Sequence, residues 1–126
     1  MTAGATPRTA IVLNRDLMFG SRIRNALRAL ELDAQFVKDT NEFIAAARAA
    51  GDVSVIGIID MNGLVEWEAL SAALAEDPDF PPTLGFGAHV DVETRRAAKA
   101  AGVTRIVSNG DFHRDMPVLI ARYRRA

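Results

Sequence analysis

Short apolar runs alternate with segments of helical periodicity along most of the chain. The runs are rich in β-branched residues, which is typical of strands buried on both faces. They occupy 10–13, 34–37, 53–59, 83–88 and 103–107. Hydrophobic residues three or four positions apart predict helices over 21–32, 39–50, 64–74 and 91–101, and from about 115 onward. Strands in regular alternation with helices predict a parallel sheet covered by helices on both faces.

Local signals mark the ends of several of these elements. Asp39 precedes Glu42 by three residues, which is a capping-box pattern with Asp in place of Ser or Thr. Gly51 is expected to end the helix that follows, Asn109-Gly110 predicts a turn, and Pro117 fits the first turn of the last helix. Five strand–helix units favour a flavodoxin-like α/β fold with strand order 2-1-3-4-5, in which the functional crevice lies at the carboxyl ends of the strands.

Composition narrows the class of protein. The 126 residues include no cysteine, which excludes disulfides and cysteine-based chemistry. Fifteen basic and sixteen acidic side chains give a net charge of -1, which argues against a nucleic-acid binder. No apolar run approaches the roughly 20 residues of a membrane helix, and residues 1–9 carry no secretory signal. We therefore expect a disordered leader over 1–8, one domain over 9–126, a cytoplasmic location, and neither a membrane nor a nucleic-acid partner.

Polar residues and glycines follow four of the predicted strands, and two stretches there are distinctive. Val55 to Asn62 reads VIGIIDMN, and Gly87 to Val107 contains GAHVD, ETRRAAKAAG and TRIV in that order. In these residues the chain resembles the receiver domain of bacterial two-component response regulators, over roughly 9–125. The resemblance implies the CheY-like version of the flavodoxin-like fold.

The resemblance also implies a chemistry, which is transfer of a phosphoryl group to an aspartate. Asp60 corresponds to the phospho-accepting aspartate, and Asn62 to the residue whose backbone carbonyl joins the shell of a divalent cation. Such a site needs further carboxylates to hold the cation, together with a hydroxyl and a lysine that contact the phosphoryl oxygens.

Most of these further groups are replaced in this sequence. Asn14 and Arg15 correspond to the acidic pair, and a one-residue shift in register would bring in only Asp16. Gly87 corresponds to the switch hydroxyl, Ile106 to the switch aromatic, and Asn109 to the lysine. We expect Arg15 to pair with Asp60 and neutralise it. The sequence thus predicts a degenerate, pseudo-receiver pocket without catalytic residues, without a metal site and without a cofactor.

Other conspicuous residues have simpler interpretations. His89 and His113 lack a second ligand at metal-binding spacing. Trp67 is expected to pack in the core with Leu64, Leu70 and Leu74. Asp60 could instead cap the next helix. The arginines Arg122, Arg124 and Arg125 fit a solvated helix end or, less simply, a contact with an acidic partner.

These observations favour a stand-alone pseudo-receiver that acts as a signalling and protein-interaction module and is not an enzyme. Its partner, a protein or a second copy, is expected on the face of the fourth helix, fifth strand and fifth helix, where the helix carries Val92, Ala97, Ala98 and Ala101. One alternative is an unconventional receiver that is phosphorylated on Asp60 in a phosphorelay, with Mg²⁺. Another is a flavodoxin-like small-molecule or nucleotide binder, although the loop NRDLMFGS lacks a glycine- and hydroxyl-rich phosphate cradle.

Overall fold

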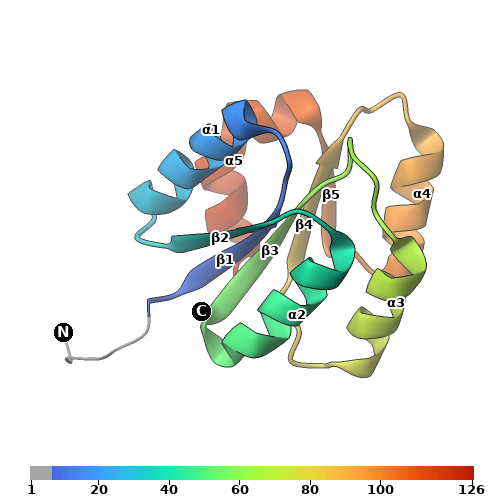
Figure 1. Ribbon diagram of the computed structural model, residues 1–126. Helices are drawn as coiled ribbons and strands as arrows, with labels where there is room; N and C mark the ends of the chain where they lie inside the picture. The colour runs from blue at the N-terminus through green and yellow to red at the C-terminus, as the bar shows by residue number, and fades with distance from the viewer. Residues whose placement is uncertain (1–6) are drawn as a thin grey trace.

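Five parallel strands form a single sheet at the centre of the molecule (Figure 1). The computed structural model describes residues 7–126, so most of the predicted leader, residues 1–6, lies outside the described part. The strands are β1 (Thr9–Leu13), β2 (Asp33–Val37), β3 (Ser54–Asp60), β4 (Thr83–Gly87) and β5 (Arg105–Ser108). Their order is β2-β1-β3-β4-β5 and every pair is parallel, which confirms the predicted topology.

Helices cover both faces of the sheet, as the alternation predicted. They are α1 (Leu17–Ala29), α2 (Thr40–Ala50), α3 (Trp67–Glu76), α4 (Val92–Ala101) and α5 (Asn109–Tyr123), with a short 3₁₀ turn, η1 (Gly51–Val53), after α2. Helices α1 and α5 pack together on one face, and α2, α3 and α4 cover the other (Figure 1). Within residues 7–126 none of the helices has the length and apolar character that a bilayer crossing requires.

Each face has its own apolar core. On the α1–α5 face, Phe86 and Phe112 stack with ring centroids 4.1 Å apart and both side chains are fully buried. On the other face the ring of Phe43 lies directly over Gly57, where a Cβ would come within 2.5 Å of the ring. The glycine in β3 therefore makes room for the aromatic side chain from α2.

Helix α1 begins four residues earlier than predicted. The Asp16 carboxylate accepts hydrogen bonds from the backbone N–H groups of Met18 (2.9 Å) and Phe19 (3.2 Å), so Asp16 is the N-cap. The first residues after this cap are apolar but exposed, and Leu17 is 90% exposed. They therefore add nothing to the buried stripe from which the helix was predicted. The predicted cap of α2 is confirmed, because Asp39 accepts the N–H of Glu42 and Glu42 accepts that of Lys38.

Helix α5 also begins earlier than predicted, because Asn109-Gly110 is its first turn and not a separate turn. Ser108 caps it by accepting the N–H of Asp111. The helix is interrupted at Asp115, whose backbone is not helical, and Pro117 lies in the first turn of the second half. Since proline has no N–H, the carbonyl of His113 lacks its usual helical donor. The guanidinium of Arg22 in α1 donates to that carbonyl instead (3.4 Å).

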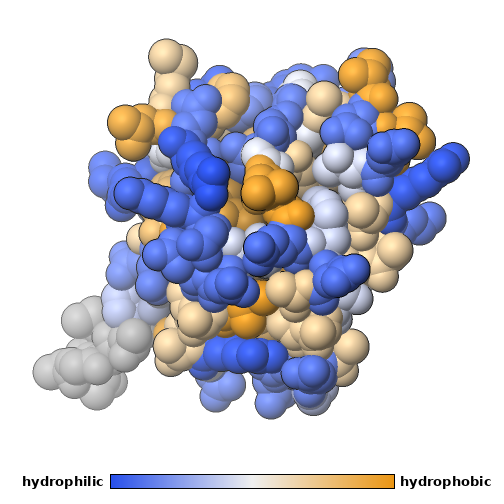
Figure 2. Space-filling model, turned by 45° about the vertical axis from the view of Figure 1, so that its right-hand side comes forward, coloured by the Kyte–Doolittle hydropathy of each residue, from blue (hydrophilic) through white to orange (hydrophobic). Residues whose placement is uncertain are grey.

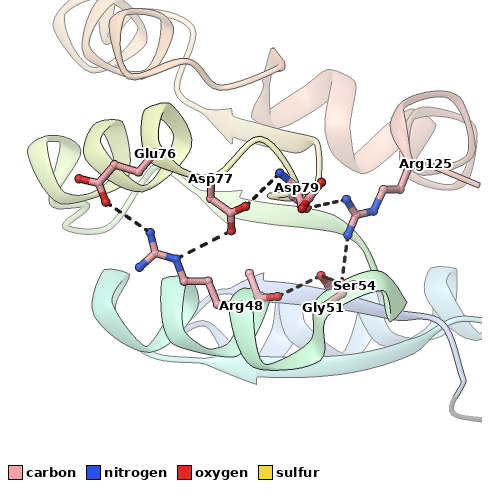
Figure 3. Close-up of polar contacts among 8 residues, drawn as sticks. Arg48, Gly51, Ser54, Glu76, Asp77, Asp79 and Arg125 are labelled. Carbon is pink, nitrogen blue, oxygen red and sulfur yellow. Dashed lines mark hydrogen bonds and ion pairs between the residues drawn. The ribbon is translucent and has the colours of Figure 1, made fainter.

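Arginines hold together the amino end of the sheet, opposite the crevice (Figure 3). Arg125 donates to the backbone carbonyls of Asp79 (2.7 Å) and Gly51 (3.0 Å), which lie in the loops that precede β4 and β3. Arg48 lies 3.8 Å from the carboxylate of Glu76 and 3.9 Å from that of Asp77. The expectation of a solvated helix end was therefore wrong for Arg125, which connects three segments of the fold.

Candidate functional site

Asp60 lies at the carboxyl end of β3 and belongs to a short chain of hydrogen-bonded side chains. Its Oδ1 accepts the backbone N–H of Asn62 (2.9 Å) and the Asn62 side-chain amide (2.8 Å). The same amide pairs reciprocally with Asn109, at 2.8 and 3.0 Å. This series of hydrogen bonds links the end of β3 to Asn109, the first residue of α5. Asp60 accepts from the turn that follows it and does not cap α3, whose N-cap residue is Glu66.

The residues that follow β1 are bonded to each other. Asn14 is 8% exposed, its amide nitrogen donates to the Asp16 carbonyl (2.8 Å), and its side-chain oxygen accepts the Asp16 N–H (3.1 Å). The Asp16 carboxylate is the cap of α1. Both side chains thus shape the turn from β1 into α1, and the only carboxylate of this turn accepts hydrogen bonds from the helix.

The predicted ion pair between Arg15 and Asp60 is not formed. The Nε of Arg15 donates to the backbone carbonyl of Lys38 at the end of β2 (2.7 Å). Among residues 7–126 the ion pairs closer than 4 Å involve only Arg48 and Arg114. Arg15 and Asp60 do line one small cavity of about 30 Å³, together with Asn14 and Lys38. The two residues are therefore close, but the arginine is directed toward β2.

Met61 lies over Gly87, the residue that the resemblance matches to the switch hydroxyl. Its side chain is 4% exposed, and its N–H donates to the carbonyl of Phe86 (2.8 Å). A Cβ added at Gly87 would lie 3.2 Å from the Cβ of Met61, and one added at Gly85 would lie 2.6 Å from its sulfur. The two glycines of β4 thus leave the space that the methionine fills. Ile106 is half-buried and packs against the core of the α2–α4 face.

His113 lies near this centre, a position that no pattern in the sequence predicted. Its ring stacks on Phe19 with centroids 4.2 Å apart and meets Phe86 and Phe112 edge-on, and neither ring nitrogen has a hydrogen-bond partner. Burial, with the nearby Arg22 guanidinium, holds the pKa of His113 below its ordinary value, while the Asp60 and Asp16 carboxylates act in the opposite direction. The neutral form of His113 is therefore favoured, and its ring is part of the aromatic packing. His89, in contrast, is exposed in the loop before α4.

Few groups that could hold Mg²⁺ surround Asp60. That ion takes six oxygen ligands, several of them water, and is usually held by one or two carboxylates. Asp60 shares this end of the sheet with amides and with Asp16, whose Oδ1 already accepts two hydrogen bonds. No group of three or more acidic, histidine or cysteine side chains within residues 7–126 could hold a metal ion.

A basic groove lies between α4 and β5. It encloses about 400 Å³ and is lined by Val92, Arg95, Arg96, Lys99, Val103, Thr104, Arg105 and Ile106. Ala98 and Ala101 are buried against the core, whereas Ala97 is half-buried and Val92 is exposed, so only two of the four residues predicted to meet a partner pack inward. The groove therefore offers positive charge over an apolar base. Figure 2, in which the α3–α4 side comes forward, shows mostly hydrophilic side chains with separate apolar groups among them.

The carboxyl end of the sheet also carries an apolar rim. Five of the six large hydrophobic side chains that are exposed in residues 7–126 lie in or beside the loops after β1, β3 and β4, namely Leu17, Met18, Leu64, Val90 and Val92. Leu64 is 77% exposed and precedes α3, so its predicted place in the core was wrong. Leu70 is buried as predicted, and Trp67 and Leu74 are partly buried against the same core.

Solved structures with the same fold are numerous, although neither a family model nor a curated protein matches the sequence. The chemotaxis response regulator CheY4 of Vibrio cholerae aligns over 94% of this chain and 99% of its own, with a TM-score of 0.74 and 17% identity. The receiver domain of the sensor histidine kinase PA1611 from Pseudomonas aeruginosa, with magnesium in its active-site cleft, covers 94% and 98%, with a TM-score of 0.76 and 13% identity.

The phosphorylated cyanobacterial phytochrome response regulator RcpA aligns over 94% of each chain, with a TM-score of 0.74 and 13% identity. At such low identities the agreement concerns the fold. The chain therefore has the CheY-like receiver fold that the resemblance implied.

Proposed function

We propose that the chain is a signalling and protein-interaction module on a receiver fold, and that Asp60 is not phosphorylated by the Mg²⁺-dependent route. The observation that carries this proposal is the Asp60–Asn62–Asn109 chain of hydrogen bonds. Two amides occupy the surroundings where the chemistry needs carboxylates for a cation and a lysine for the phosphoryl oxygens. Met61 adds to the argument, because it fills the space beside Gly87 that a switch hydroxyl would use.

The decisive experiment is intact-mass spectrometry after incubation with Mg²⁺ and acetyl phosphate. We expect no gain of a phosphoryl group, while RcpA, known in a phosphorylated form, is modified under the same conditions. Asp60→Ala serves as the matched control. A Mg²⁺-dependent gain in the wild type that is absent from this variant would overturn the proposal and support the unconventional receiver.

The interaction surface that we propose is the face formed by α4, β5 and α5, and its groove favours an acidic partner. Arg95, Arg96, Lys99 and Arg105 line the groove, and none of them has a carboxylate within 4 Å in residues 7–126. Charged groups without internal partners steer and orient an oppositely charged partner. On α5, by contrast, Asp111 and Asp115 both bind Arg114, at 2.8 and 3.1 Å. The α5 carboxylates of a second copy would thus already be paired, so we favour a different, acidic protein.

Sedimentation velocity separates an acidic partner from self-association. We expect the wild type to sediment as a monomer over a range of concentrations, and Arg105→Ala and Asp111→Ala to sediment identically. A concentration-dependent dimer that either variant weakens would contradict the acidic-partner proposal and identify this face as a homodimer interface.

A further inference from the structure

A second, larger pocket lies on the other side of Arg15, between the start of α1 and the end of β2. It encloses about 490 Å³, which is within the usual range for small-molecule sites. Asn14, Arg15 and Lys38 also line the small cavity beside Asp60, so they form the wall between the two spaces. The pocket faces away from the α4–β5 groove and is independent of the interaction proposed for it.

The pocket is strongly cationic. Arg15, Arg24 and Lys38 line it, and none of the three makes an ion pair within residues 7–126. Asp16 is the only acidic residue of the lining, and its Oδ1 accepts two N–H groups of α1. These N–H groups therefore have their acceptor already, and positive charge for a ligand must come from the three side chains.

The cations are arranged so that two kinds of contact are available. Because the Nε of Arg15 donates to the Lys38 carbonyl (2.7 Å), the guanidinium is fixed beside the Lys38 backbone and its terminal nitrogens are left as donors. The guanidinium of Arg24 lies over the ring of Phe36, 4.7 Å from its centroid. A guanidinium that is stacked in this way presents a flat outer surface on which another planar group can stack.

We propose that this pocket binds a nucleoside phosphate. The base stacks on the Arg24–Phe36 pair and against the exposed side chain of Leu17, and the phosphate lies between Arg15 and Lys38. Arginine binds phosphate through paired N–H donors and lysine binds it as a point charge, so the two complement each other at one anion. The phosphate contacts thus come from side chains. The backbone of the loop NRDLMFGS cannot provide them, because this loop has no phosphate cradle.

Two-dimensional ¹H–¹⁵N NMR of the whole chain provides the test, with AMP, GMP, adenosine and inorganic phosphate as probes. We expect AMP or GMP to shift the amide signals of Leu17, Gly20, Phe36 and Lys38 in a saturable way. Adenosine or phosphate alone should bind at least roughly tenfold more weakly, because each provides only one of the two contacts. Arg24→Ala and Lys38→Ala should each weaken the binding of the nucleotide by roughly tenfold. Arg28→Ala, one turn further along α1 and outside the pocket, should leave it unchanged.

Several outcomes would overturn the proposal. Phosphate that binds as tightly as AMP and GMP would show a simple anion site, and shifts confined to the α4–β5 groove would show non-specific attraction to basic side chains. No shift with any probe at millimolar concentration would also overturn it. The dispersion of the variant spectra verifies that Arg24→Ala and Lys38→Ala remain folded. None of these results depends on whether Asp60 is phosphorylated or on which protein occupies the α4–β5 groove.

Discussion

The centre around Asp60 and the pocket between α1 and β2 are neighbours that share residues, yet they are built in opposite ways. In the centre the polar side chains bond to each other and leave a cavity of about 30 Å³. The adjoining pocket has a volume of about 490 Å³ and three cations without a carboxylate partner. Polar groups that satisfy each other stabilise a fold, whereas those without internal partners remain available to a ligand. The comparison therefore supports the two proposals made above, that Asp60 is not phosphorylated and that the adjoining pocket binds a ligand.

The largest effect on stability is expected from a side chain added at Gly87, beside Met61. Gly87→Thr would force its Cβ to within 3.2 Å of the Cβ of Met61. We expect it to lower the free energy of unfolding by about 1–3 kcal/mol, which is the usual cost of overpacking. Urea denaturation measures the change.

Two controls make this prediction specific. Gly63→Thr introduces the same residue where a Cβ meets nothing within 4 Å, and it should change stability by less than about 0.5 kcal/mol. Combining Gly87→Thr with Met61→Ala should destabilise the protein less than the sum of the two single changes, because alanine keeps the Cβ of Met61 but removes the atoms beyond it, including the Cε 3.7 Å from the added Cβ, and so makes room for the threonine side chain. Strictly additive effects would contradict the close packing of Met61 on Gly87.

A smaller effect is expected when the amide pair of the centre is broken. Asn62→Ala and Asn109→Ala should each destabilise the fold by about 0.5–1 kcal/mol, because each removes the reciprocal hydrogen bonds. The double variant should cost little more than either single one. Thermal or urea unfolding of the three proteins gives the coupling energy, with Asn25→Ala, on the exposed side of α1, as the control. Full additivity would indicate that the pair contributes nothing.

The histidine next to the centre should make stability depend on pH. Because the folded state holds the pKa of His113 below its ordinary value of 6.5, the unfolded chain binds the proton more readily. The contribution of the neutral His113 to the free energy of unfolding is therefore complete above about pH 6.5, and it declines as the pH falls toward the folded-state pKa. His113→Phe retains an aromatic ring that can stack on Phe19, and it should lose this part of the dependence. Equal slopes of unfolding free energy against pH in both proteins would count against a neutral, half-buried ring.

The smallest effect is expected in the open pocket. Lys38→Ala and Arg24→Ala should change the free energy of unfolding by no more than about 0.5 kcal/mol, as is usual for exposed positions. The same variants should weaken nucleotide binding strongly, so stability and binding are separated in this region. A loss of stability as large as that expected for Gly87→Thr would show that the cations serve the fold, and the comparison between the two regions would fail.

The fold could be predicted from the sequence because its signal is repeated along the chain. Apolar runs such as 53–59 and helical spacing between them were enough for the strand order. The start of α5 was predictable in principle, since Ser108 precedes Asp111 by three residues in a capping pattern, but Asn109-Gly110 was interpreted as a turn. The start of α1 was hidden because its first residues are apolar and exposed.

The contacts of the candidate site were much less predictable. Asn62 and Asn109 are 47 positions apart, and no local pattern indicates that two amides will pair. The partner of Arg15 is a backbone carbonyl, which every residue carries and which therefore leaves no trace in the sequence. The residues at the carboxyl ends of the strands could be named in advance, but how their side chains choose among neighbouring acceptors depends on three-dimensional geometry.

The interruption of α5 at Asp115 has a consequence for how the molecule opens. Phe112 is the only buried residue of the first half, whereas Met116, Leu119 and Ile120 bury the second half. The first half is therefore held by fewer core contacts, and we expect its amides to exchange with deuterium through an opening of lower free energy than those of the second half. Since Asn109 begins that half, we expect its hydrogen bonds with Asn62, and through Asn62 with Asp60, to break and re-form more often than the contacts of the second half.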